Sequence, residues 1–418
     1  MYKDKTSDYF EGVAAKYLRA VDANPNKSNQ HEIGGLPSAG FMRFLGTPHE
    51  HEKIRFRAKQ VYITDESLAP EVSEGRVTWY DVRSYDSKRD PEYRLYYYPN
   101  SVTELISEGD FLLIAKMRDG SLLMVFTPPG GTIENQLRLL FGLDRVGSRV
   151  KAGSLDNVAL LLPLRLMLEG LGLDLGHKDA EDDEWLSRLI KDFGGDKFPT
   201  TSIFSEYARK NLADIIDPVS SPDNAIVGWM EHEEKLFRIY ERYLVQQRLR
   251  KGFGCEGEDV EAFISFSLSV QNRRKSRVGH AFEGHLSCIF RMHGLNFQQG
   301  GGKGFTTENN SKPDFVFPGF VQYRDPEFPL EKLMMLGAKT TCKDRWRQVL
   351  SEAHRVRSKH LITLEAAISE RQTSEMKSHG LSLVVPLPIQ RTYSDEQQGW
   401  LLGLGDFIEC VRNSQKFV

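Results

Sequence analysis

Two short segments in the second half of the chain end in charged side chains that suit phosphodiester hydrolysis. Asp314 precedes the apolar run 315–317, and the apolar run 333–338 ends at Lys339. Both segments are typical of buried strands that end at a polar group. Hydrolysis of a phosphodiester needs carboxylates that hold Mg²⁺ and a nearby lysine that orients or activates the attacking water. Asp314 and Lys339 on neighbouring strands would supply both kinds of group.

The widespread nuclease pattern PD-(D/E)xK has an acidic residue two positions before its lysine, and Gly337 occupies that position in this chain. A carboxylate from another segment must therefore complete the site. Glu352 is the natural substitute, because it lies in the segment KDRWRQVLSEAHR, whose residues favour a helix directly after the lysine. Glu283, in the helical segment GHAFEGHLS, is a candidate for a further acidic position in catalysis. Asp314 and Glu352 are the predicted ligands of Mg²⁺.

The residues alone leave open a structural role for the pair, as a turn aspartate and a surface lysine. The longer segments around them favour catalysis. SVQNRRKSRVGHAFEGHL, KPDFVFP, EFPLEKLMMLGAKTTCKDRWRQVLSEA and HLITLEAAIS resemble the catalytic domain of the EcoRII-like type II restriction endonucleases. The resemblance implies an α/β restriction-endonuclease-like fold, a variant of PD-(D/E)xK, whose active site contains Asp314, Lys339 and Glu352. It also implies that Tyr323, in GFVQYRD, lies near the scissile phosphate.

Three polar residues follow the lysine strand, and they would place base-reading groups close to the scissile phosphate: Lys343, Asp344 and Arg345. Arginine pairs with guanine and aspartate accepts a hydrogen bond from cytosine, so the triplet suits a G·C-rich half-site. The alternative is a solvated helix start, in which the carboxylate is favoured by the helix dipole. The resemblance implies base reading, because related enzymes read a CC…GG frame from this place.

Four cations lie in the segment NRRKSR, directly before the helical segment that contains Glu283. Such runs are commonly solvated surface, and they also bind phosphates without reading the base sequence. We expect contacts to the DNA backbone from Arg273, Arg274, Lys275 and Arg277.

The first half of the chain contains short β-type runs, which are IRFRAKQVYIT, GRVTWYDVRSY, EYRLYYYP, DFLLIAKM and SLLMVFT. Turn signals such as Asp119-Gly120 separate them, and the pattern predicts a small barrel or sandwich. Segments such as SNQHEIGGLPS and YDSKRDPEYRLYYYP resemble, more distantly, the N-terminal effector domain of the same enzymes, a DNA-binding pseudobarrel. The resemblance implies that this domain binds a second copy of the recognition site, with DNA contacts from His31, Lys88, Arg89, Glu92 and Arg94. The alternatives are that the histidine is a turn residue, or that the domain reads a modified base or another site.

The change of pattern along the chain predicts two domains, an N-terminal effector domain at 1–180 and a catalytic domain at 197–418. The acidic run KDAEDDE lies near the boundary, and we place a linker at 181–196. In the catalytic domain, predicted helices alternate with short apolar strands, which indicates a central mixed sheet. The helices are expected at 281–293 and 343–356, and the strands at 314–317, 333–339, 360–363 and 381–386.

The composition excludes several classes of protein. A formal net charge of −3 over 418 residues gives no sign of a generally basic nucleic-acid-binding protein, so DNA contacts must come from local clusters. The four cysteines form no CxxC pair, which argues against a zinc or redox motif and fits a reducing cytoplasm. The chain contains no apolar run long enough to span a membrane and no signal-like start, so we expect neither secretion nor a membrane.

These inferences predict a homodimeric, Mg²⁺-dependent type II site-specific deoxyribonuclease that cuts double-stranded DNA at a short CC…GG-type palindrome. A twofold dimer reads a palindrome, and a cytosine methyltransferase is expected in the same restriction–modification system. One alternative is a non-catalytic DNA-binding repressor or modification sensor with a decayed nuclease fold, which the retained Asp, Lys and Glu residues disfavour. The other is a nicking nuclease that acts on mismatches, and the oligomeric state would distinguish it.

Overall fold

In the computed structural model the chain forms two compact units. The N-terminal unit comprises Lys3–Leu175 together with Ala367–Gln372, and the C-terminal unit comprises Met1–Tyr2, Gly176–Ala366 and Thr373–Val418. The structure describes residues 5–23, 31–67, 69–86, 88–143, 145–146, 149–150, 155, 160–171, 173, 181–254, 257–300, 305–308, 311–342 and 345–416.

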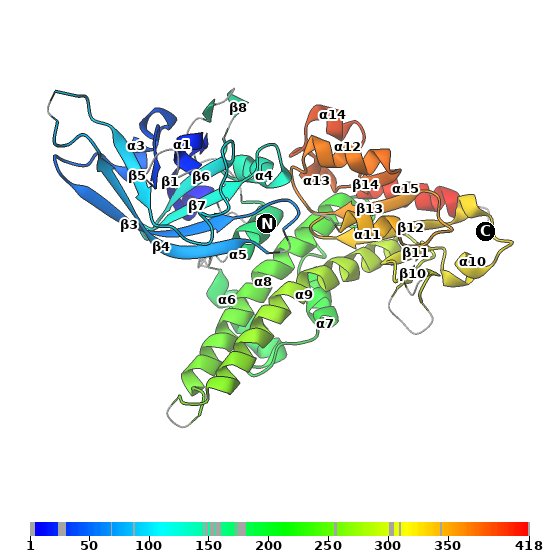
Figure 1. Ribbon diagram of the computed structural model, residues 1–418. Coiled ribbons are helices and arrows are strands. Elements are labelled where there is room, and N and C mark those ends of the chain that lie inside the picture. Colours follow the sequence, from blue (N-terminus) through cyan, green and yellow to red (C-terminus); the bar gives the residue numbers. More distant parts are fainter. Residues whose placement is uncertain are drawn as a thin grey trace. The chain divides into compact units, whose positions relative to one another are not determined.

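The N-terminal unit is built on a seven-stranded sheet with the strand order β1-β6-β7-β3-β4-β5-β2 (Figure 1). All neighbouring strands are antiparallel except β3 and β7, which are parallel. The strands are β1 (Phe10–Tyr17), β2 (Glu32–Ile33), β3 (Lys53–Tyr62), β4 (Glu71–Asp81), β5 (Tyr93–Tyr97), β6 (Phe111–Met117) and β7 (Leu122–Thr127). The expected β-rich character is confirmed, and the five predicted runs are β3 to β7.

Strand β1 was not among the predicted strands, because four consecutive buried residues in it hide the alternation that marks a half-exposed strand. The core of this unit contains fully buried side chains such as Phe41, Trp79 and Leu95. The remaining elements before residue 171 are η1 (Thr6–Asp8), α1 (Ala20–Ala23), η2 (Pro37–Ala39), α3 (Met42–Leu45), α4 (Thr132–Leu140), β8 (Arg145–Val146), β9 (Arg149–Val150) and α5 (Leu162–Gly170).

The C-terminal unit contains a five-stranded mixed sheet with the order β10-β11-β12-β13-β14. The strands are β10 (Gln298–Gln299), β11 (Phe315–Phe317), β12 (Met334–Lys339), β13 (Lys359–Thr363) and β14 (Leu381–Val384). The first three strands pair antiparallel and the last three pair parallel. The predicted α/β domain with a central mixed sheet is thus confirmed, and β11 to β14 lie within two residues of the four expected strands.

Two long helices of the C-terminal unit, α8 (Pro222–Lys251) and α9 (Val260–Met292), lie side by side as a hairpin (Figure 1). Helix α9 begins at a capping aspartate, since the side chain of Asp259 accepts a hydrogen bond from the backbone N of Ala262. The other helices after residue 181 are α6 (Asp182–Phe193), α7 (Thr201–Lys210), α10 (Phe320–Arg324), η4 (Leu330–Lys332), α11 (Trp346–Leu350), α12 (Glu370–Ser378), α13 (Leu387–Gln390), α14 (Asp395–Gln398) and α15 (Leu404–Gln415).

The range 181–196, which we expected as a linker, contains helix α6. Its Leu189 is fully buried in a core cluster with Phe204 and Leu236. These residues therefore pack as part of the C-terminal unit, because α6 is an amphipathic helix, and Asp182, Asp183 and Glu184 form its first turn. Among the described residues, no helix combines the length and apolar character needed to cross a lipid bilayer.

Candidate active site

The antiparallel pairing of β11 and β12 brings the predicted aspartate and lysine together. Phe315 pairs with Leu336, so Asp314, just before β11, lies beside the end of β12. Oδ2 of Asp314 accepts a hydrogen bond from the backbone N of Ala338 at 2.7 Å and one from Nζ of Lys339 at 2.7 Å. The two side chains are 13% and 18% exposed, so the ion pair is accessible at the edge of the sheet but held in a defined geometry.

Packing explains why the position two residues before the lysine is a glycine. A Cβ atom at Gly337 would lie 2.7 Å from Cγ2 of Val349, a buried residue of α11. An acidic side chain there would collide with the helix that follows the strand. Val349 of α11 thus packs over Gly337 of β12, and the residues directly after α11 follow this contact.

Glu352 lies in a turn directly after α11, whereas we expected it on a helix spanning 343–356. The helix ends early for two reasons. Nζ of Lys359, on β13, donates hydrogen bonds to the backbone O of Leu350 and, at 2.5 Å, to the backbone O of Glu352. Ala353 has a φ of 47°, a left-handed conformation that a helix cannot contain. The helix prediction was therefore wrong beyond Leu350.

The electrostatic surroundings of Glu352 couple it to the aspartate–lysine pair. Burial, followed by the negative charge of Asp314, raises the pKa of its carboxyl to about 7, against the opposing charges of Lys339 and Lys359. Its Oε2 atom is buried and has no hydrogen-bond partner. A buried, unpaired carboxylate oxygen beside a second carboxylate is costly unless a cation approaches it.

Glu283 approaches the same group of residues from α9, a helix that packs against β12. Burial raises the pKa of its carboxyl, the charge of Asp314 raises it further, and Lys339 and His280 lower it. The charges of Asp314 and Lys339 thus shift the pKa values of both Glu352 and Glu283. Asp314 and Lys339 are in direct contact at the end of β12, and the two glutamates lie within the range of their charges.

The residues of this site fit a Mg²⁺ ion that is bound jointly by protein carboxylates and by the phosphate oxygens of the substrate. Among the described residues, no three Asp, Glu, His or Cys side chains converge into a ready-made metal site. Mg²⁺ commonly takes only one or two protein carboxylates and completes its shell with waters and substrate phosphate oxygens. The unpaired Oε2 of Glu352, next to the charge of Asp314, is the donor that such an ion would use.

Tyr323, expected near the scissile phosphate, is only 3% exposed. Its hydroxyl donates a hydrogen bond to Oε2 of Glu308 at 2.5 Å and accepts one from the backbone N of Arg355 at 3.4 Å. The hydroxyl is therefore directed toward the turn that follows Glu352. In this geometry both its donor and its acceptor capacity are used within the protein.

Of the predicted base-reading triplet, Lys343 and Asp344 lie outside the described residues. Arg345 directly precedes α11. Its Nη2 atom donates to the backbone O of Thr341 at 2.8 Å and to Oγ1 of the same residue at 2.6 Å. The guanidinium is thus braced against the segment that follows the catalytic lysine.

Arg277 does not have the surface position that a phosphate contact needs, and this expectation was wrong. Its side chain is 5% exposed and forms ion pairs with Glu233 and Glu234 of α8. The guanidinium also lies 3.7 Å from the centroid of the Phe237 ring. It holds α8 and α9 together as a buried ion-pair centre, so a phosphate could not reach it without opening the hairpin.

The other cations of this run differ in exposure. Arg274 is 64% exposed, although its Nε donates to the buried carboxylate of Glu241 at 2.5 Å. The guanidinium of Arg273 lies over the ring of Phe198. The side chain of Lys275 lies outside the described residues. Arg273 and Arg274 remain the predicted backbone contacts that the structure describes.

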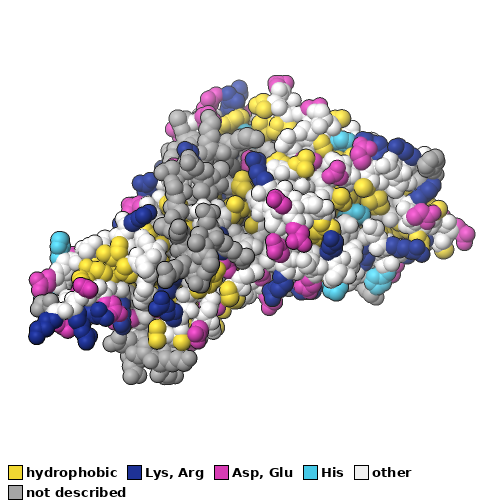
Figure 2. All heavy atoms as spheres, turned by 90° about the horizontal axis from the view of Figure 1, so that it is seen from above, with side chains coloured by type: hydrophobic (Ala, Val, Ile, Leu, Met, Phe, Trp, Pro, Cys, Tyr) yellow, Lys and Arg dark blue, Asp and Glu magenta, His cyan; other side chains and the backbone are white. Residues whose placement is uncertain are grey.

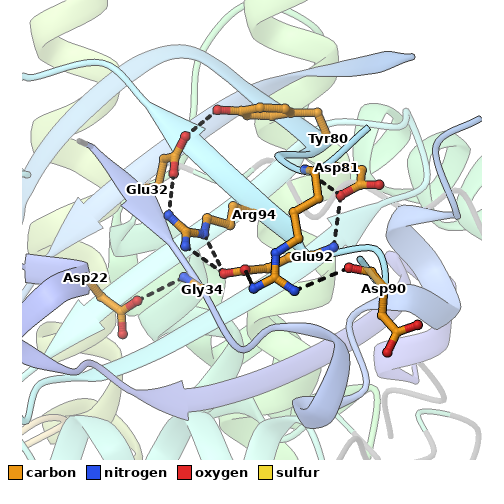
Figure 3. Close-up of polar contacts among 9 residues, drawn as sticks. Asp22, Glu32, Gly34, Tyr80, Asp81, Asp90, Glu92 and Arg94 are labelled. Atoms are coloured by element: carbon orange, nitrogen blue, oxygen red, sulfur yellow. Dashed lines mark hydrogen bonds and ion pairs between the residues drawn. The ribbon is translucent and has the colours of Figure 1, made fainter. Parts of the chain in front are cut away.

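In the N-terminal unit, Arg94 lies on β5 and Glu92 lies just before it, and Figure 3 shows their polar contacts with neighbouring residues. Arg94 pairs with Glu32 at 2.9 Å and with Glu92 at 2.6 Å, and Glu92 also pairs with Arg83 at 2.5 Å. The guanidinium of Arg94 lowers the pKa of the Glu92 carboxyl. Because Tyr80 donates its hydroxyl proton to Glu32, the group forms a continuous network across β2, β4 and β5.

The remaining predicted contacts of this unit differ in exposure. Lys88 and Arg89 are exposed, and Arg89 lies 3.5 Å from Asp86. His31 is partly buried, and its ring packs edge-on against Tyr97. Figure 2 shows Lys and Arg side chains interspersed with Asp and Glu over most of one face, with a group of Lys and Arg at its left end, in the N-terminal unit.

Four further residues beside the site were missed by reasoning from the sequence, namely Thr307, Glu308, Arg355 and Lys359. All four contact the turn that carries Glu352 or form part of it. A lysine at the start of a strand and a Thr-Glu pair in a loop carry no local signal of such a role. Only the strand pairing and the loop path bring them together.

A strand-end aspartate–lysine pair with two carboxyl groups within the range of its charges supplies the class of groups that metal-assisted phosphodiester hydrolysis uses. Comparison with known proteins agrees with this class. Residues 237–408 match the family described as EcoRII C terminal. The EcoRII-like resemblance expected from the sequence is therefore confirmed for the segment that contains all four catalytic candidates.

Two curated relatives are similar to parts of the chain. The type II restriction enzyme EcoRII of Escherichia coli is 38% identical over 249 residues, which cover 59% of this chain and 57% of that enzyme. The type II restriction enzyme SsoII of Shigella sonnei is 34% identical over 110 residues, covering 25% of this chain and 35% of that enzyme. The matched part of the chain thus spans just over half of EcoRII and about a third of SsoII.

Solved structures show weaker likeness. Metal-depleted Ecl18kI in complex with uncleaved, modified DNA is 21% identical with a TM-score of 0.44, covering 56% of this chain and 85% of that chain. The B3 domain of the UbaLAI restriction endonuclease with cognate DNA is 18% identical with a TM-score of 0.21, covering 35% of this chain and 92% of that domain. TM-scores of this size do not by themselves establish a shared fold.

Proposed function

We propose that the chain is a Mg²⁺-dependent type II restriction endonuclease that cleaves double-stranded DNA at a short CC…GG-type palindrome. One observation carries the proposal, which is the hydrogen-bonded ion pair of Asp314 and Lys339 at the end of β12, with the carboxyl groups of Glu352 and Glu283 within the range of its charges. The match of residues 237–408 to the EcoRII C-terminal family and the identity to two restriction enzymes support it.

In this proposal Asp314 and Glu352 hold Mg²⁺, and bound Mg²⁺ supplies positive charge to the phosphate that is attacked. Asp314 keeps one oxygen engaged with Lys339 and Ala338, which fixes its carboxylate and leaves the other oxygen for the ion. Glu352 offers its unpaired Oε2. The negative charge of Asp314 disfavours ionisation of Glu352. A cation bound between the two carboxylates would relieve this repulsion, which is why the site would take up Mg²⁺.

Lys339 and Glu283 have complementary roles in the proposal. Nζ of Lys339 lies 2.7 Å from Asp314 and projects to the edge of the sheet, where it can orient the attacking water by hydrogen bonding. Glu283, whose pKa is raised by burial, is suited to hold or accept a proton at its carboxyl oxygen.

DNA recognition is proposed for the residues that flank this site. Lys343, Asp344 and Arg345 would read G·C pairs, and Arg273 and Arg274 would contact phosphates. A palindrome is cut in both strands by a homodimer, which is the proposed state of assembly. Protection of host DNA would require a cytosine methyltransferase as a partner in the same restriction–modification system.

The N-terminal unit is proposed to be an effector domain with a pseudobarrel fold that binds a second copy of the site. Arg94 of this unit pairs with Glu32 and Glu92 within the seven-stranded sheet, so support for a DNA-binding role comes from the exposed cations. Lys88 and Arg89 are exposed, so they could reach a phosphate backbone, and His31 would contribute beside them. The proposal assigns the effector role to residues 1–180 and the catalytic role to residues 197–418, and the presence of two compact units supports a division into two domains.

The experiment that tests the proposed function compares the full chain with its Asp314→Ala variant on plasmid DNA and Mg²⁺. We expect the variant to lose cleavage while it keeps its affinity for the duplex, because a metal ligand stabilises the transition state and not the bound ground state. Asp395→Ala, at an exposed position in the first turn of α14, is the matched control. Cleavage by the Asp314 variant at more than a few per cent of the wild-type rate would refute the assignment.

A further inference from the structure

The turn that follows Glu352 is held in an unusual way, because side chains from other segments bind consecutive backbone groups. Nζ of Lys359 donates to the backbone O of Glu352. The backbone N of Ala353 donates to Oγ1 of Thr307 at 3.4 Å, and the next residue donates its backbone N to Oε2 of Glu308 at 3.3 Å. The backbone N of Arg355 donates to the hydroxyl of Tyr323. Four consecutive residues are thus each fixed by a different side chain.

The contacts of this turn are linked to one another. Oε2 of Glu308 accepts both the hydroxyl proton of Tyr323 at 2.5 Å and the backbone N–H of the turn. Arg355 extends its guanidinium back to α10, where it donates to the backbone O of Tyr323 and to the backbone O of Asp325. The loop before β11, helix α10 and strand β13 therefore converge on one turn.

The conformation of the turn shows why such support is needed. Ala353 is fully buried and has a φ of 47°, a left-handed conformation that is strained for a residue with a Cβ atom. Such a conformation persists only where surrounding contacts determine it. Glu352 itself uses no side-chain hydrogen bond at Oε2, so the position of this carboxylate depends on the backbone that carries it.

We propose that Thr307, Glu308, Tyr323 and Lys359, here named the turn clamp, are positioning residues that fix the Glu352 carboxylate for metal binding. This inference rests on the proposed function. It gives Tyr323 a task different from contact with the scissile phosphate, since its hydroxyl acts through the backbone of the turn. Glu308 is the centre of the turn clamp, because it joins the tyrosine hydroxyl to the turn backbone.

The first measurement is hydrogen exchange of the backbone amides in the metal-free full chain, followed by mass spectrometry of peptides spanning 346–358. Tyr323→Phe removes only the hydroxyl, so we expect exchange at the amides of residues 353–355 to become about tenfold faster or more. Tyr240→Phe is the matched control, because it removes another buried tyrosine hydroxyl, which donates to Gly194 in the same unit. That variant should leave exchange in 346–358 unchanged.

The second measurement is the Mg²⁺ dependence of single-turnover DNA cleavage. We expect Tyr323→Phe to raise the Mg²⁺ concentration for half-maximal cleavage several-fold and to lower the rate about tenfold, with duplex affinity unchanged. Glu308→Gln keeps an acceptor oxygen, so it should resemble the wild type more closely than Glu308→Ala does.

Two outcomes would overturn the proposal. In the first, Tyr323→Phe has wild-type exchange and wild-type Mg²⁺ dependence, so the hydroxyl does not support the turn. In the second, this variant cleaves slowly although exchange at residues 353–355 is unchanged, so the hydroxyl acts on the DNA directly. If the wild-type chain does not cut DNA at all, the proposed function fails, while the exchange experiment still tests whether the turn clamp holds the turn.

Discussion

Replacement of Glu352 by glutamine should make the metal-free protein more stable at alkaline pH. In the folded chain, burial and the neighbouring Asp314 raise the pKa of this carboxyl from its ordinary value of 4.5 to about 7. Below pH 4.5 the carboxyl is neutral in both the folded and unfolded states, so it adds no pH-dependent cost. Between pH 4.5 and 7 the unfolded state releases its proton first, and the folded state loses stability as the pH rises.

The magnitude follows from the same change in pKa. A rise from 4.5 to about 7 corresponds to about 3 kcal/mol above pH 7. Solvent reaches part of this side chain and screens its charge, so we expect a gain of about 1–3 kcal/mol for Glu352→Gln at pH 8. At pH 4 the variant and the wild type should have nearly equal stability, because glutamine replaces a neutral carboxyl of the same shape.

Urea unfolding in EDTA at pH 4 and pH 8 measures this difference, with Glu396→Gln, at an exposed glutamate of α14, as the control. Addition of Mg²⁺ at pH 8 should stabilise the wild type more than the Glu352 variant, because a ligand that binds the folded state raises its stability by mass action. A variant that is less stable than the wild type at pH 8 in EDTA would refute the argument. So would a gain that is equally large at both pH values.

Four further substitutions test other parts of the account. Lys339→Arg should not cleave DNA in single-turnover assays, because a guanidinium cannot replace a compact ammonium group at this place, and wild-type activity would reduce the lysine to a simple charge. Arg277→Ala should lower the free energy of unfolding by about 3–5 kcal/mol, since it leaves two buried glutamates without their partner. Its DNA affinity should keep the wild-type dependence on salt, and a slope reduced by about one unit would instead indicate a phosphate contact. Gly337→Asp restores the common motif, yet it should destabilise the protein by about 1–3 kcal/mol because of the close approach of Val349, and wild-type stability and activity would contradict the packing argument. Arg345→Ala should cost about 1–3 kcal/mol of binding on the cognate duplex and little on a scrambled one, and an equal loss on both would mean that this side chain is only a phosphate anchor.

The sequence predicted the central pair of the site because strand ends are visible in the hydrophobic pattern. The apolar runs that end at Lys339 and begin after Asp314 are short and bounded by polar residues, and they pair as neighbouring strands in the structure. Gly337 indicated that the acidic position was empty. The reason for the glycine, which is the approach of α11, could not be seen before the helix was placed against the strand.

The local structure around Glu352 could not be predicted, because distant contacts overrule helix propensity there. The composition of the segment favours a helix. However, Lys359 donates hydrogen bonds to backbone carbonyl groups at the end of α11, and the turn contains a residue in the left-handed conformation. Arg277 was misjudged for a similar reason. Its partner Glu234 lies 43 residues earlier in the chain, and a run of cations gives no sign that one member points into a helical hairpin.

In the N-terminal unit too, the strands were predictable from the sequence, whereas the side-chain contacts between strands were not. Strands β3 to β7 follow from alternating apolar residues and turn signals, and the structure contains all five. Glu92 and Arg94 were predicted as DNA contacts without any sign of a pairing between them, whereas Arg94 forms ion pairs with both Glu92 and Glu32. Such a pairing across strands depends on register, which a single sequence does not specify.

The most direct test of the central claim is to map the ends that the full chain produces on DNA of known sequence. The protein is incubated with Mg²⁺ and a plasmid library, and the 5′ and 3′ ends are sequenced, with the Asp314→Ala variant and an EDTA sample as controls. We predict ends at one short CC…GG-type palindrome, cut in both strands, and no ends in either control. Ends scattered without a shared sequence, or the same ends from the Asp314 variant, would contradict the assignment of a site-specific nuclease centred on Asp314.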